Sequence, residues 1–401
     1  MRWIVAGTHS LDSVVRVSTY HLVRYLTRPE QRLGSEPTPT RDSGENRVLY
    51  LPAPISLLHF LLRRSDARFQ ERRLFWSRRP KPWSDGIVQL TPLTLLPLLK
   101  RFPFDSPRLI PWSLRATVPP LAAALGGAGF LRPDVLIITN LQYATLDQIV
   151  RPRSLVYRCV DDIRGFARAP RSLARAEVDL LKRCDFCFAT SSSLAEKLKA
   201  RGAKRVHIIR HGVDFARFAD ASSLAEPADL ARIPRPRIVY VGTLSEWFNA
   251  EWVGAAARSL PRYHFLLIGP RETGDAPMPA GPNVHLLGPR QPDVVPAYLH
   301  ACDAAMIPFR VSPLVESVLP VKVYEFLAAG LPVVAARWRE LEQVGAPIML
   351  AGNAEDFAEA VRRAPGSPGR DERIAFARAN SWERQFETMV AIIRGTEDSP
   401  R

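Results

Sequence analysis

The chain has 401 residues, 46% of them hydrophobic, and a formal net charge of +15. Its length exceeds one typical hydrophobic core, and its apolar content is ample for globular packing, so we expect two domains. No run reaches the roughly 18 uncharged apolar residues of a membrane span, and residues 1–7 are too short for the core of a signal peptide, so we expect a chain that stays on the cytoplasmic side.

The positive charge is concentrated in the first half of the chain. Residues 1–215 contain 35 Lys and Arg against 18 Asp and Glu, whereas the remainder contains 20 against 22. Much of the excess lies between residues 60 and 83, where basic side chains are mixed with aromatic and aliphatic ones. This mixture favours contact with an anionic membrane surface. The candidate contacts are Arg63, Arg64, Arg68, Arg72, Arg73, Trp76, Arg78 and Arg79.

Two other interpretations of this charge stay open. Basic charge with stacking aromatics would also suit nucleic acid, but no helix-turn-helix, zinc-finger or RNA-recognition signature accompanies it, so we expect no nucleic-acid partner. A GC-rich genome that places Arg on solvated faces would explain the use of arginine, but not its concentration in one half.

Apolar strands alternate with amphipathic helices along the chain, which is typical of parallel sheets in α/β domains. In the first half we predict strands near residues 2–7, 47–51, 87–91, 134–139, 154–159, 185–190 and 205–209. In the second half we predict strands near residues 237–242, 263–268, 284–287, 303–307, 332–335 and 347–350.

Composition suggests where the domains meet. Residues 218–236 have no strong apolar period and are expected to form a linker. The first domain would then span residues 1–217 and the second residues 237–380, followed by a last helix within 381–401. Residues 33–46 are polar and predict a mobile loop; residues 91–99 are too apolar for a free loop and should be buried or form a further membrane contact.

The four cysteines are Cys159, Cys184, Cys187 and Cys302. Their spacing is not that of a zinc site, and residues 184–187 are expected to alternate within a strand rather than form a redox turn. We therefore expect buried structural thiols in a reducing compartment.

The most informative segment is residues 320–335. Pro320 is expected to start a helix and Gly330 to end it, so Lys322 and Glu325 share one face of its first turns. A helix start that carries a lysine can hold phosphate, and a carboxylate one turn along can accept hydrogen bonds from a ribose diol. The segment predicts a site for a nucleotide diphosphate. The alternative is an ordinary ion pair on a helix surface.

The chain lacks the sequence motifs of two classes of nucleotide-binding protein. Neither half has Gly-x-Gly-x-x-Gly after its first strand, which removes the main support for a dinucleotide oxidoreductase. No Gly-x-x-x-x-Gly-Lys-Ser/Thr loop is present, which disfavours an ATPase.

Four segments occur in the order and spacing of the two-domain GT-B glycosyltransferases, and residues 130–395 resemble that family. The segments are the interdomain crossover at 208–214, the first strand and loop of the nucleotide-binding domain at 237–248, the base-binding turn at 282–290 and the donor-nucleotide helix at 320–335. The resemblance implies two Rossmann-like doubly wound domains facing a central cleft, with the C-terminal helix crossing back to the N-terminal domain. That N-terminal, basic domain would bind the acceptor.

The resemblance also implies which residues bind the nucleotide sugar, with Lys322 at the diphosphate and Glu325 at the ribose. The full set is Gly242, Thr243, Leu244, Gly288, Pro289, Arg290, Phe309, Lys322, Tyr324 and Glu325. Residues 242–244 and 288–290 depart from the xanthan-type glucuronosyltransferases of this fold, which leaves the donor sugar open. Arg271, Arg290 and Arg310 would either pair with a uronate carboxylate or be solvated.

A base is needed in the first domain, because a sugar hydroxyl is a poor nucleophile at neutral pH. Asp161 and Asp162 follow a strand, and functional groups of such sheets gather beyond strand ends. Residues 155–161 resemble the xanthan-type glucuronosyltransferases and related group 1 exopolysaccharide enzymes, which implies Asp161 as the catalytic base.

Adjacent extended residues point in opposite directions, so only one aspartate should face the site. His9 and Asp162 are acceptor-side candidates; their alternatives are a satisfied loop histidine and a capping or turn carboxylate. His211 is expected at a hinge or interface.

We therefore predict transfer of a sugar, with glucuronic acid as one candidate, from a UDP-sugar to a lipid-linked or oligosaccharide acceptor in bacterial exopolysaccharide or cell-surface glycan synthesis. The protein would associate peripherally with the inner face of the cell membrane. We expect inversion and no cofactor or metal, since Lys322 and the helix start would hold the departing diphosphate and no Asp-x-Asp motif lies between strands. The alternatives are a retaining GT4-like transferase with another nucleotide sugar, and a non-catalytic nucleotide- or membrane-binding protein.

Overall fold

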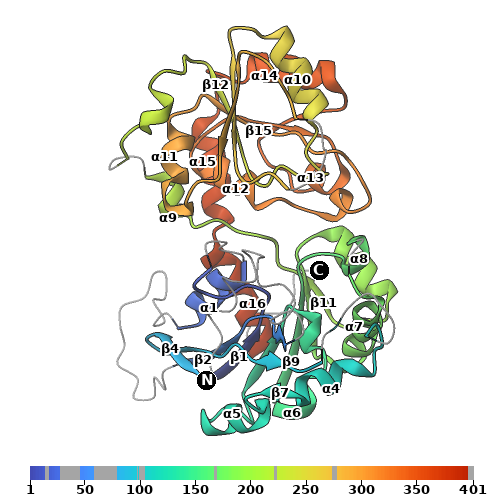
Figure 1. Cartoon of the computed structure of the whole chain (residues 1–401). Coiled ribbons are helices and arrows are strands. Elements are labelled where there is room, and N and C mark those ends of the chain that lie inside the picture. Colours follow the sequence, from blue (N-terminus) through green and yellow to red (C-terminus); the bar gives the residue numbers. More distant parts are fainter. Residues whose placement is uncertain are drawn as a thin grey trace. The chain divides into compact units, whose positions relative to one another are not determined.

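The computed structural model describes residues 1–13, 18–27, 46–57, 79–96, 98, 104–166, 169–220, 224–272 and 278–395. The chain divides into two compact units (Figure 1). The first unit comprises Met1–Ile209 and Thr388–Arg401, and the second comprises Arg210–Glu387.

The first unit is built on an eight-stranded sheet with the order β11-β10-β9-β8-β1-β2-β5-β4. Its strands are β1 (Arg2–Ala6), β2 (Arg47–Leu51), β4 (Lys81–Ser84), β5 (Ile87–Gln89), β8 (Val135–Ile138), β9 (Ser154–Cys159), β10 (Phe186–Ala189) and β11 (Val206–Ile208). Neighbouring strands are parallel except in the β4–β5 pair. The central strands are almost wholly apolar, as expected for strands that are covered on both faces. A separate small sheet contains β3 (Ile55–Ser56), β6 (Leu93–Thr94) and β7 (Thr117–Val118).

Helices cover both faces of the large sheet, as two adjacent residues of β9 show. The Tyr157 hydroxyl donates to Glu177 Oε1 at 2.8 Å, and Arg158 Nη1 donates to Ser18 Oγ at 2.8 Å on the opposite face. The helices of this unit are α1 (Ser18–Thr27), α4 (Leu109–Arg115), α5 (Leu121–Gly127), α6 (Asp147–Val150), α7 (Arg171–Arg183) and α8 (Ser192–Ala200), with the 3-10 turns η1 (Leu141–Tyr143) and η2 (Ile163–Gly165).

The second unit has a six-stranded, fully parallel sheet with the order β14-β13-β12-β15-β16-β17. Its strands are β12 (Arg237–Val241), β13 (His264–Ile268), β14 (Val284–Gly288), β15 (Ala304–Ile307), β16 (Val333–Ala336) and β17 (Met349–Ala351). Its helices are α9 (Phe215–Ala219), α10 (Ala250–Ser259), α11 (Val295–His300), α12 (Val321–Ala328), α13 (Arg339–Gln343), α14 (Ala354–Arg363) and α15 (Arg370–Ala379), with η3 (Ala228–Leu230), η4 (Pro292–Val294) and η5 (Val315–Ser317).

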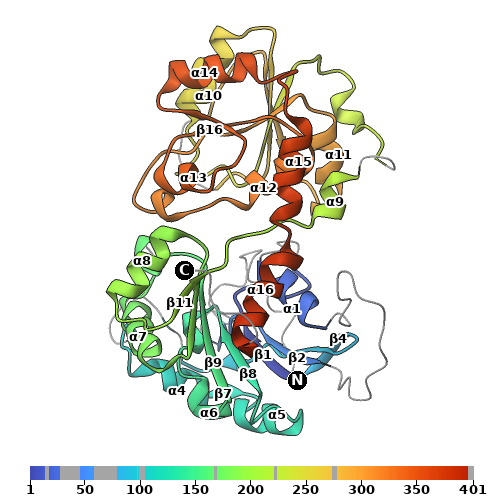
Figure 2. The same cartoon turned by 180° about the vertical axis from the view of Figure 1, so that it is seen from behind.

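Within the second unit, α10 and α14 pack together on one face of the sheet, and α12 and α15 pack on the other (Figures 1 and 2). Trp252 lies against Phe357 in the first helix pair, with ring centroids 5.7 Å apart. In the second pair, Tyr324 stacks on Phe376 at 6.0 Å. Aromatic contacts therefore anchor a helix layer on each face.

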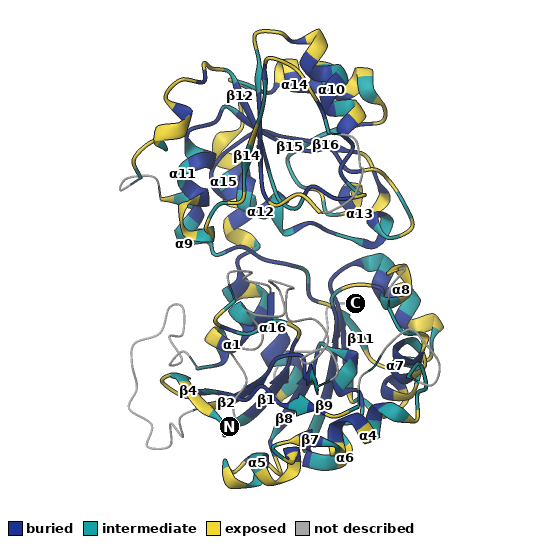
Figure 3. Cartoon of the chain, in the orientation of Figure 1, coloured by how far each residue is buried: buried dark blue, intermediate teal, exposed yellow. Residues whose placement is uncertain are grey.

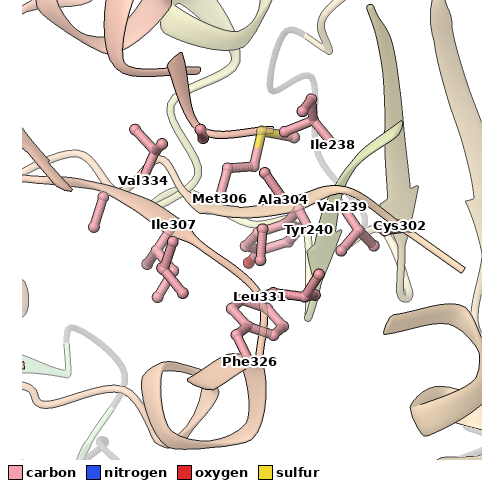
Figure 4. Close-up of a cluster of buried hydrophobic side chains, with 14 of the residues drawn as sticks. Ile238, Val239, Tyr240, Cys302, Ala304, Met306, Ile307, Phe326, Leu331 and Val334 are labelled. Carbon is pink, nitrogen blue, oxygen red and sulfur yellow. The ribbon is translucent and has the colours of Figure 1, made fainter. Parts of the chain in front are cut away.

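The core of the second unit is formed by consecutive buried residues of its central strands, whose side chains fill both faces of the sheet. Figure 4 shows Tyr240 of β12 and Ile307 of β15 in one cluster with Phe326 of α12, all fully buried. Figure 3 shows the same pattern in each unit, where the strands are buried and the outer helix surfaces are exposed.

The chain passes between the units twice, before Arg210 and within α16 (Trp382–Arg394). In the second unit, the segment that follows the first passage pairs with the segment that precedes the second. The Trp382 N–H donates to the Val213 carbonyl at 3.0 Å, and the His211 ring packs edge-on against Trp382 at 5.9 Å. A Cβ on Gly212 would lie 2.7 Å from the Trp382 nitrogen, so this close approach requires glycine.

The predicted α/β fold of two doubly wound domains is confirmed, and every predicted strand occurs within about two residues of its expected bounds. Helix α12 begins directly after Pro320, and Gly330 follows it with a φ of +76°. The expected linker differs: described residues of 218–236 pack into the second unit, where Phe218, Leu230 and Ile233 are buried. The expected loop at 33–46 lies outside the described residues, except for Asn46.

Candidate functional site

Three glycines lie where neighbouring strands of the second sheet end. Gly242 follows β12, Gly269 follows β13, and Gly288 ends β14. The Gly242 N–H donates to the Ile268 carbonyl at 2.8 Å, and the Gly269 N–H donates to the Gly288 carbonyl at 3.0 Å. A Cβ on Gly269 would overlap the Gly242 carbonyl oxygen. Only glycine allows these loops to approach so closely at the carboxyl edge of the sheet, where ligands of such folds bind.

Gly269 was not among the predicted site residues. The signal for it was present, since Gly269-Pro270 directly follows an apolar strand. A glycine at that point of a strand pattern marks a turn or a close backbone approach.

Lys322 lies over the Gly242 loop. A Cβ on Gly242, which has a φ of +154°, would overlap the Lys322 Cε and lie 2.9 Å from Nζ. The parallel sheet thus brings the predicted phosphate helix and the first loop of the unit together. The residue before the helix, Pro320, supplies no side-chain cap, so the first N–H groups of α12 and the Lys322 ammonium form a positive locus suited to phosphate.

Glu325 lies one turn along the same helix. Lys322 and Glu325 are both half-buried, and within the residues described neither forms a salt bridge. Burial lowers the pKa of Lys322 against the effect of Glu325. Burial also raises the pKa of Glu325, although Lys322 and Arg217 oppose this. The two side chains are therefore not the ordinary surface ion pair of the alternative interpretation, and both keep their hydrogen-bonding groups for a ligand.

Four more predicted binding residues lie around this edge, and three of them have buried side chains. Leu244 and Phe309 are buried, with the Phe309 ring stacked on Trp338 at 6.0 Å. Tyr324 is fully buried, and burial raises the pKa of its hydroxyl. Thr243 contributes its backbone carbonyl to the Tyr240 hydroxyl at 3.0 Å. The buried side chains of Leu244, Phe309 and Tyr324 support this edge from within the core, so a ligand contact from these three residues would come from their backbone.

Arg290 anchors the end of the predicted base-binding turn, residues 282–290. Its Nη2 donates to Asp229 Oδ2 at 2.6 Å and its Nε to the Tyr298 hydroxyl at 2.7 Å. Although burial alone would raise the pKa of Asp229, the hydrogen bonds from Arg290 and Tyr298 hold it below its usual value. The guanidinium is thus engaged within the protein. Gly288, by contrast, faces open space, and Pro289 precedes the engaged Arg290.

Arg310 is exposed at this edge, as is Arg271. The Arg310 N–H donates to the Trp247 carbonyl at 2.7 Å, while its side chain has no hydrogen bond or ion pair with any residue that the structure describes. Arg271 pairs with Leu244 through an isolated bridge. Among the three arginines considered for a uronate, Arg290 is engaged by Asp229, whereas the exposed Arg310 guanidinium has no partner within the described residues.

Asp161 and Asp162 follow β9 in the first unit and differ sharply in their surroundings. Asp162 is buried and accepts two hydrogen bonds from Arg201, at 2.9 and 3.0 Å, and lies 3.2 Å from Lys197 Nζ. It also accepts from the Arg164 N–H at 3.2 Å and so caps η2. Although burial opposes ionisation, Arg201 holds the pKa of Asp162 below its usual value. Asp162 is therefore a structural carboxylate.

The Asp161 side chain is exposed and has no hydrogen-bond or ion-pair partner among the described residues. Although Asp161 is exposed at the surface, the protein atoms packed around its carboxyl group displace part of its hydration and raise its pKa, and the buried Arg158 guanidinium opposes this. A carboxylate with free lone pairs and a raised pKa is suited to accept a proton.

His9 lies at the same edge of the first sheet, after β1, which one strand, β8, separates from β9. Its side chain is half-buried, and its carbonyl accepts from the Tyr50 hydroxyl at 2.5 Å. The topology thus brings His9 and Asp161 to one edge, since both follow parallel strands.

An apolar and basic patch lies on the first unit beside the small sheet. We call Leu95, Trp112, Arg115 and Val118 the α4 patch. Its apolar members are 46%, 58% and 36% exposed, in that order, and the Arg115 guanidinium lies 5.9 Å from the Trp112 ring. The Leu95 N–H donates to the Ala116 carbonyl at 2.9 Å, which holds Leu95 beside the end of α4.

Of the predicted membrane contacts, Arg79 is exposed. The others, Arg63, Arg64, Arg68, Arg72, Arg73, Trp76 and Arg78, lie outside the described residues. A search of the described ranges finds no helix with the length and apolar character to cross a membrane. Nor do these ranges contain a group of three or more His, Cys, Asp or Glu that could hold a metal.

Comparisons with known proteins agree with this geometry. Residues 235–364 match the family described as glycosyl transferases group 1. Over 230 residues the chain is 26% identical to TuaH of Bacillus subtilis, named as a teichuronic acid biosynthesis glycosyltransferase, with 54% of this chain and 58% of that protein covered. The chain thus matches less than two thirds of that relative's length.

Solved structures match over nearly the whole chain. Anabaena HepE in complex with UDP has a TM-score of 0.64 at 15% identity, covering 98% of this chain and 100% of that one. Sucrose-phosphate synthase from Thermosynechococcus elongatus has a TM-score of 0.63 at 15% identity, covering 98% and 99%. Residues 235–364 therefore resemble the group 1 glycosyl transferases, and the chain as a whole has the GT-B fold.

Proposed function

We propose that this protein is a glycosyltransferase that uses a UDP-sugar to build a bacterial cell-surface polysaccharide. The observation that carries the proposal is the position of Lys322 over the Gly242 loop, at the start of α12 and one turn before Glu325. This edge offers a cation, free N–H groups and a carboxylate, which are the partners that a nucleoside diphosphate requires. The UDP bound to HepE supports uracil as the base, and the name of TuaH supports a surface glycan as the product.

In the proposed reaction, Asp161 accepts the proton of an acceptor hydroxyl. The hydroxyl oxygen attacks the anomeric carbon from the side opposite the diphosphate, which inverts the configuration. Lys322 and the N–H groups of α12 stabilise the negative charge that develops on the departing diphosphate. In this scheme the protein's own positive groups do the work of a metal ion. A retaining reaction with another nucleotide sugar is the alternative, and product anomer analysis distinguishes the two.

Glucuronic acid is our candidate for the donor sugar, within the same proposal. Arg310 follows β15 at the edge where Lys322 lies, and its exposed guanidinium suits a carboxylate. Arg290 does not serve this role in the proposal, because Asp229 already occupies it.

A lipid-linked or oligosaccharide acceptor is proposed to bind the first unit. The α4 patch joins an exposed tryptophan and two aliphatic side chains to an arginine, which is the composition of a surface that contacts anionic lipid head groups. Together with Arg79 and the net charge of residues 1–215, this supports peripheral association with the inner face of the cell membrane.

The test of the proposal is a thermal-shift and calorimetric screen against UDP, GDP, ADP and dTDP, followed by UDP-glucose and UDP-glucuronate. A ligand that binds only the folded state raises its melting temperature. We expect a shift confined to the uridine nucleotides and enlarged by one attached sugar.

Lys322→Ala should reduce the UDP shift, whereas Arg362→Ala, on the outer helix α14, should leave it unchanged. No shift of the wild-type protein with any nucleotide would overturn the proposal in favour of a non-catalytic protein. An equal loss in both variants would overturn the role of Lys322.

A further inference from the structure

Cys184 and Cys187 bring their sulfur atoms to 3.1 Å of each other. This corrects the prediction that residues 184–187 alternate within one strand. Cys184 is the residue that ends α7, where its N–H donates to the Leu180 carbonyl at 2.9 Å, and Cys187 is the second residue of β10. The turn between helix and strand folds the two side chains together, and both thiols are free.

The backbone around the pair is fixed on both sides. The Asp185 N–H donates to the Leu155 carbonyl at 2.8 Å, and the Asp185 carboxylate accepts from the Leu155 N–H at 2.8 Å. The Cys187 N–H donates to the Arg205 carbonyl at 2.8 Å. A bonded S–S distance is about 2.05 Å, so a bond requires an approach of about 1 Å with the strands in place.

The two thiols are not equivalent. Cys184 is half-buried, whereas Cys187 is buried between β9 and β11. The hydrogen bond between the two sulfur atoms lowers the pKa of Cys184, and the same bond together with burial raises that of Cys187. Because the thiolate is the nucleophile, Cys184 is the thiol that reacts first and Cys187 the one that follows.

The other two cysteines lack these features. Cys159 and Cys302 are buried, and burial raises the pKa of each to about 12. No sulfur–sulfur contact is present at either residue within the described structure. The accessibility of Cys184 and its contact with the Cys187 sulfur therefore distinguish this pair from Cys159 and Cys302.

We propose that Cys184 and Cys187 form a reversible redox pair that a small-molecule disulfide, such as oxidised glutathione, converts into an intramolecular disulfide. The Cys184 thiolate attacks one sulfur of the oxidant, forms a mixed disulfide and releases one glutathione thiolate. The Cys187 thiol gives its proton to solvent and attacks the Cys184 sulfur, which releases the second glutathione thiolate. Two protein thiols are oxidised and one disulfide is reduced to two thiols.

This pair is separate from the proposed transfer site. Cys187 pairs with Tyr157, four residues before Asp161, and the nucleotide edge belongs to the second unit. The inference stands on the sulfur geometry and does not depend on the proposed transferase activity.

Tryptic digestion gives an assay that is specific for this cysteine pair. Cleavage by trypsin after Arg183 and Lys197 yields a peptide of residues 184–197, which contains Cys184 and Cys187 and neither of the other cysteines. The reduced full-length protein is incubated with excess oxidised glutathione, quenched with acid, alkylated and digested. We expect this peptide to lose the mass of two hydrogen atoms and to resist alkylation, and dithiothreitol to restore both properties.

Single-residue variants test which cysteine attacks the oxidant and which one closes the internal disulfide. Cys187→Ala should accumulate a stable glutathione adduct on Cys184, because no second thiol can displace it. Cys184→Ser should form almost no adduct, because Cys187 is buried. Cys302→Ala is the matched control and should oxidise as the wild type does.

The proposal fails if the wild-type peptide keeps two alkylatable thiols, or if it carries glutathione without closing the internal bond. It also fails if Cys184→Ser reacts as fast as the wild type while its melting temperature shows that it is folded. Oxidation of Cys159 or Cys302 at the same rate would likewise overturn it.

Discussion

The carboxylate of Asp162 accepts two hydrogen bonds from the Arg201 guanidinium, at 2.9 and 3.0 Å. Arg201 also donates to Glu177 at 2.9 Å, and Glu177 in turn accepts from Tyr157 of β9. This network fastens the segment after β9 to α7 and α8. Asp161, the preceding residue, is left outside it with an exposed side chain. The hydrogen bonds of Asp162 thus fix the backbone that positions the exposed carboxylate of Asp161.

Asp161→Asn should remove transferase activity while the fold and the affinity for UDP are kept. The amide has nearly the same shape but cannot accept the acceptor proton, and positioned general bases contribute about a hundredfold or more to rate. Transfer from the UDP-sugar is measured with calorimetric UDP binding as the control. Turnover within a few fold of the wild type would contradict the assignment of Asp161 as the base.

Asp162→Asn should lower the free energy of unfolding. Loss of the Asp162 charge breaks its ion pair with the partly buried Arg201, which keeps Glu177 as its remaining charge partner, so we expect a loss of about 1.5–3 kcal/mol. Urea unfolding of this variant and of Asp161→Asn provides a matched comparison of adjacent residues. Equal free energies of unfolding would show that the network around Arg201 does not support the fold.

The same network predicts a pH dependence of stability. Burial of Asp162 opposes ionisation, but Arg201 outweighs it, so the folded-state pKa lies below the unfolded value of about 3.9. The stabilisation is therefore fully present above that unfolded value and is lost as the pH falls through the folded-state pKa. Acid unfolding of the wild type should be steeper than that of Asp162→Asn, followed by circular dichroism; parallel curves would refute the linkage.

Gly242→Ala should weaken UDP binding, because its Cβ would overlap the Lys322 side chain and displace the ammonium. Hydrogen bonds to charged groups contribute about 1.5–3 kcal/mol, so Kd should rise about tenfold or more. Gly254→Ala on α10 is the control, since its Cβ would come no closer than 3.4 Å to the end of the Arg258 side chain. Calorimetry that finds the same Kd for Gly242→Ala and the wild type would remove Lys322 from the phosphate site.

Trp112→Ala should reduce binding to vesicles that contain anionic phospholipid several-fold, and salt should weaken the binding that remains. Leu286→Ala is the matched control, because Leu286 is an exposed aliphatic residue of the second unit. Vesicle co-sedimentation measures both variants. Equal binding of the wild type to neutral and anionic vesicles would contradict the charge argument, and an unchanged Trp112→Ala would exclude the α4 patch.

The sequence by itself determined the strands, the doubly wound class and the helix that carries Lys322 and Glu325. These features depend on local periodicity, on Pro320 and Gly330, and on strand ends that a parallel sheet must gather at one edge. The sequence also limited the candidates for the proposed catalytic base to two adjacent aspartates, since both follow one apolar strand.

Contacts between distant segments were decided only by the tertiary structure. Hydrogen bonds from Arg201 make Asp162 the structural carboxylate of the two aspartates, and Arg290 donates a hydrogen bond to Asp229. Gly269 becomes necessary only when its loop meets Gly242. Three residues of the segment expected to link the units, Phe218, Leu230 and Ile233, are buried in the core of the second unit, which the pattern of that segment does not reveal. The meeting of Cys184 with Cys187 likewise depends on where α7 ends and β10 begins, a boundary set by pairing with β9 and β11 rather than by local pattern.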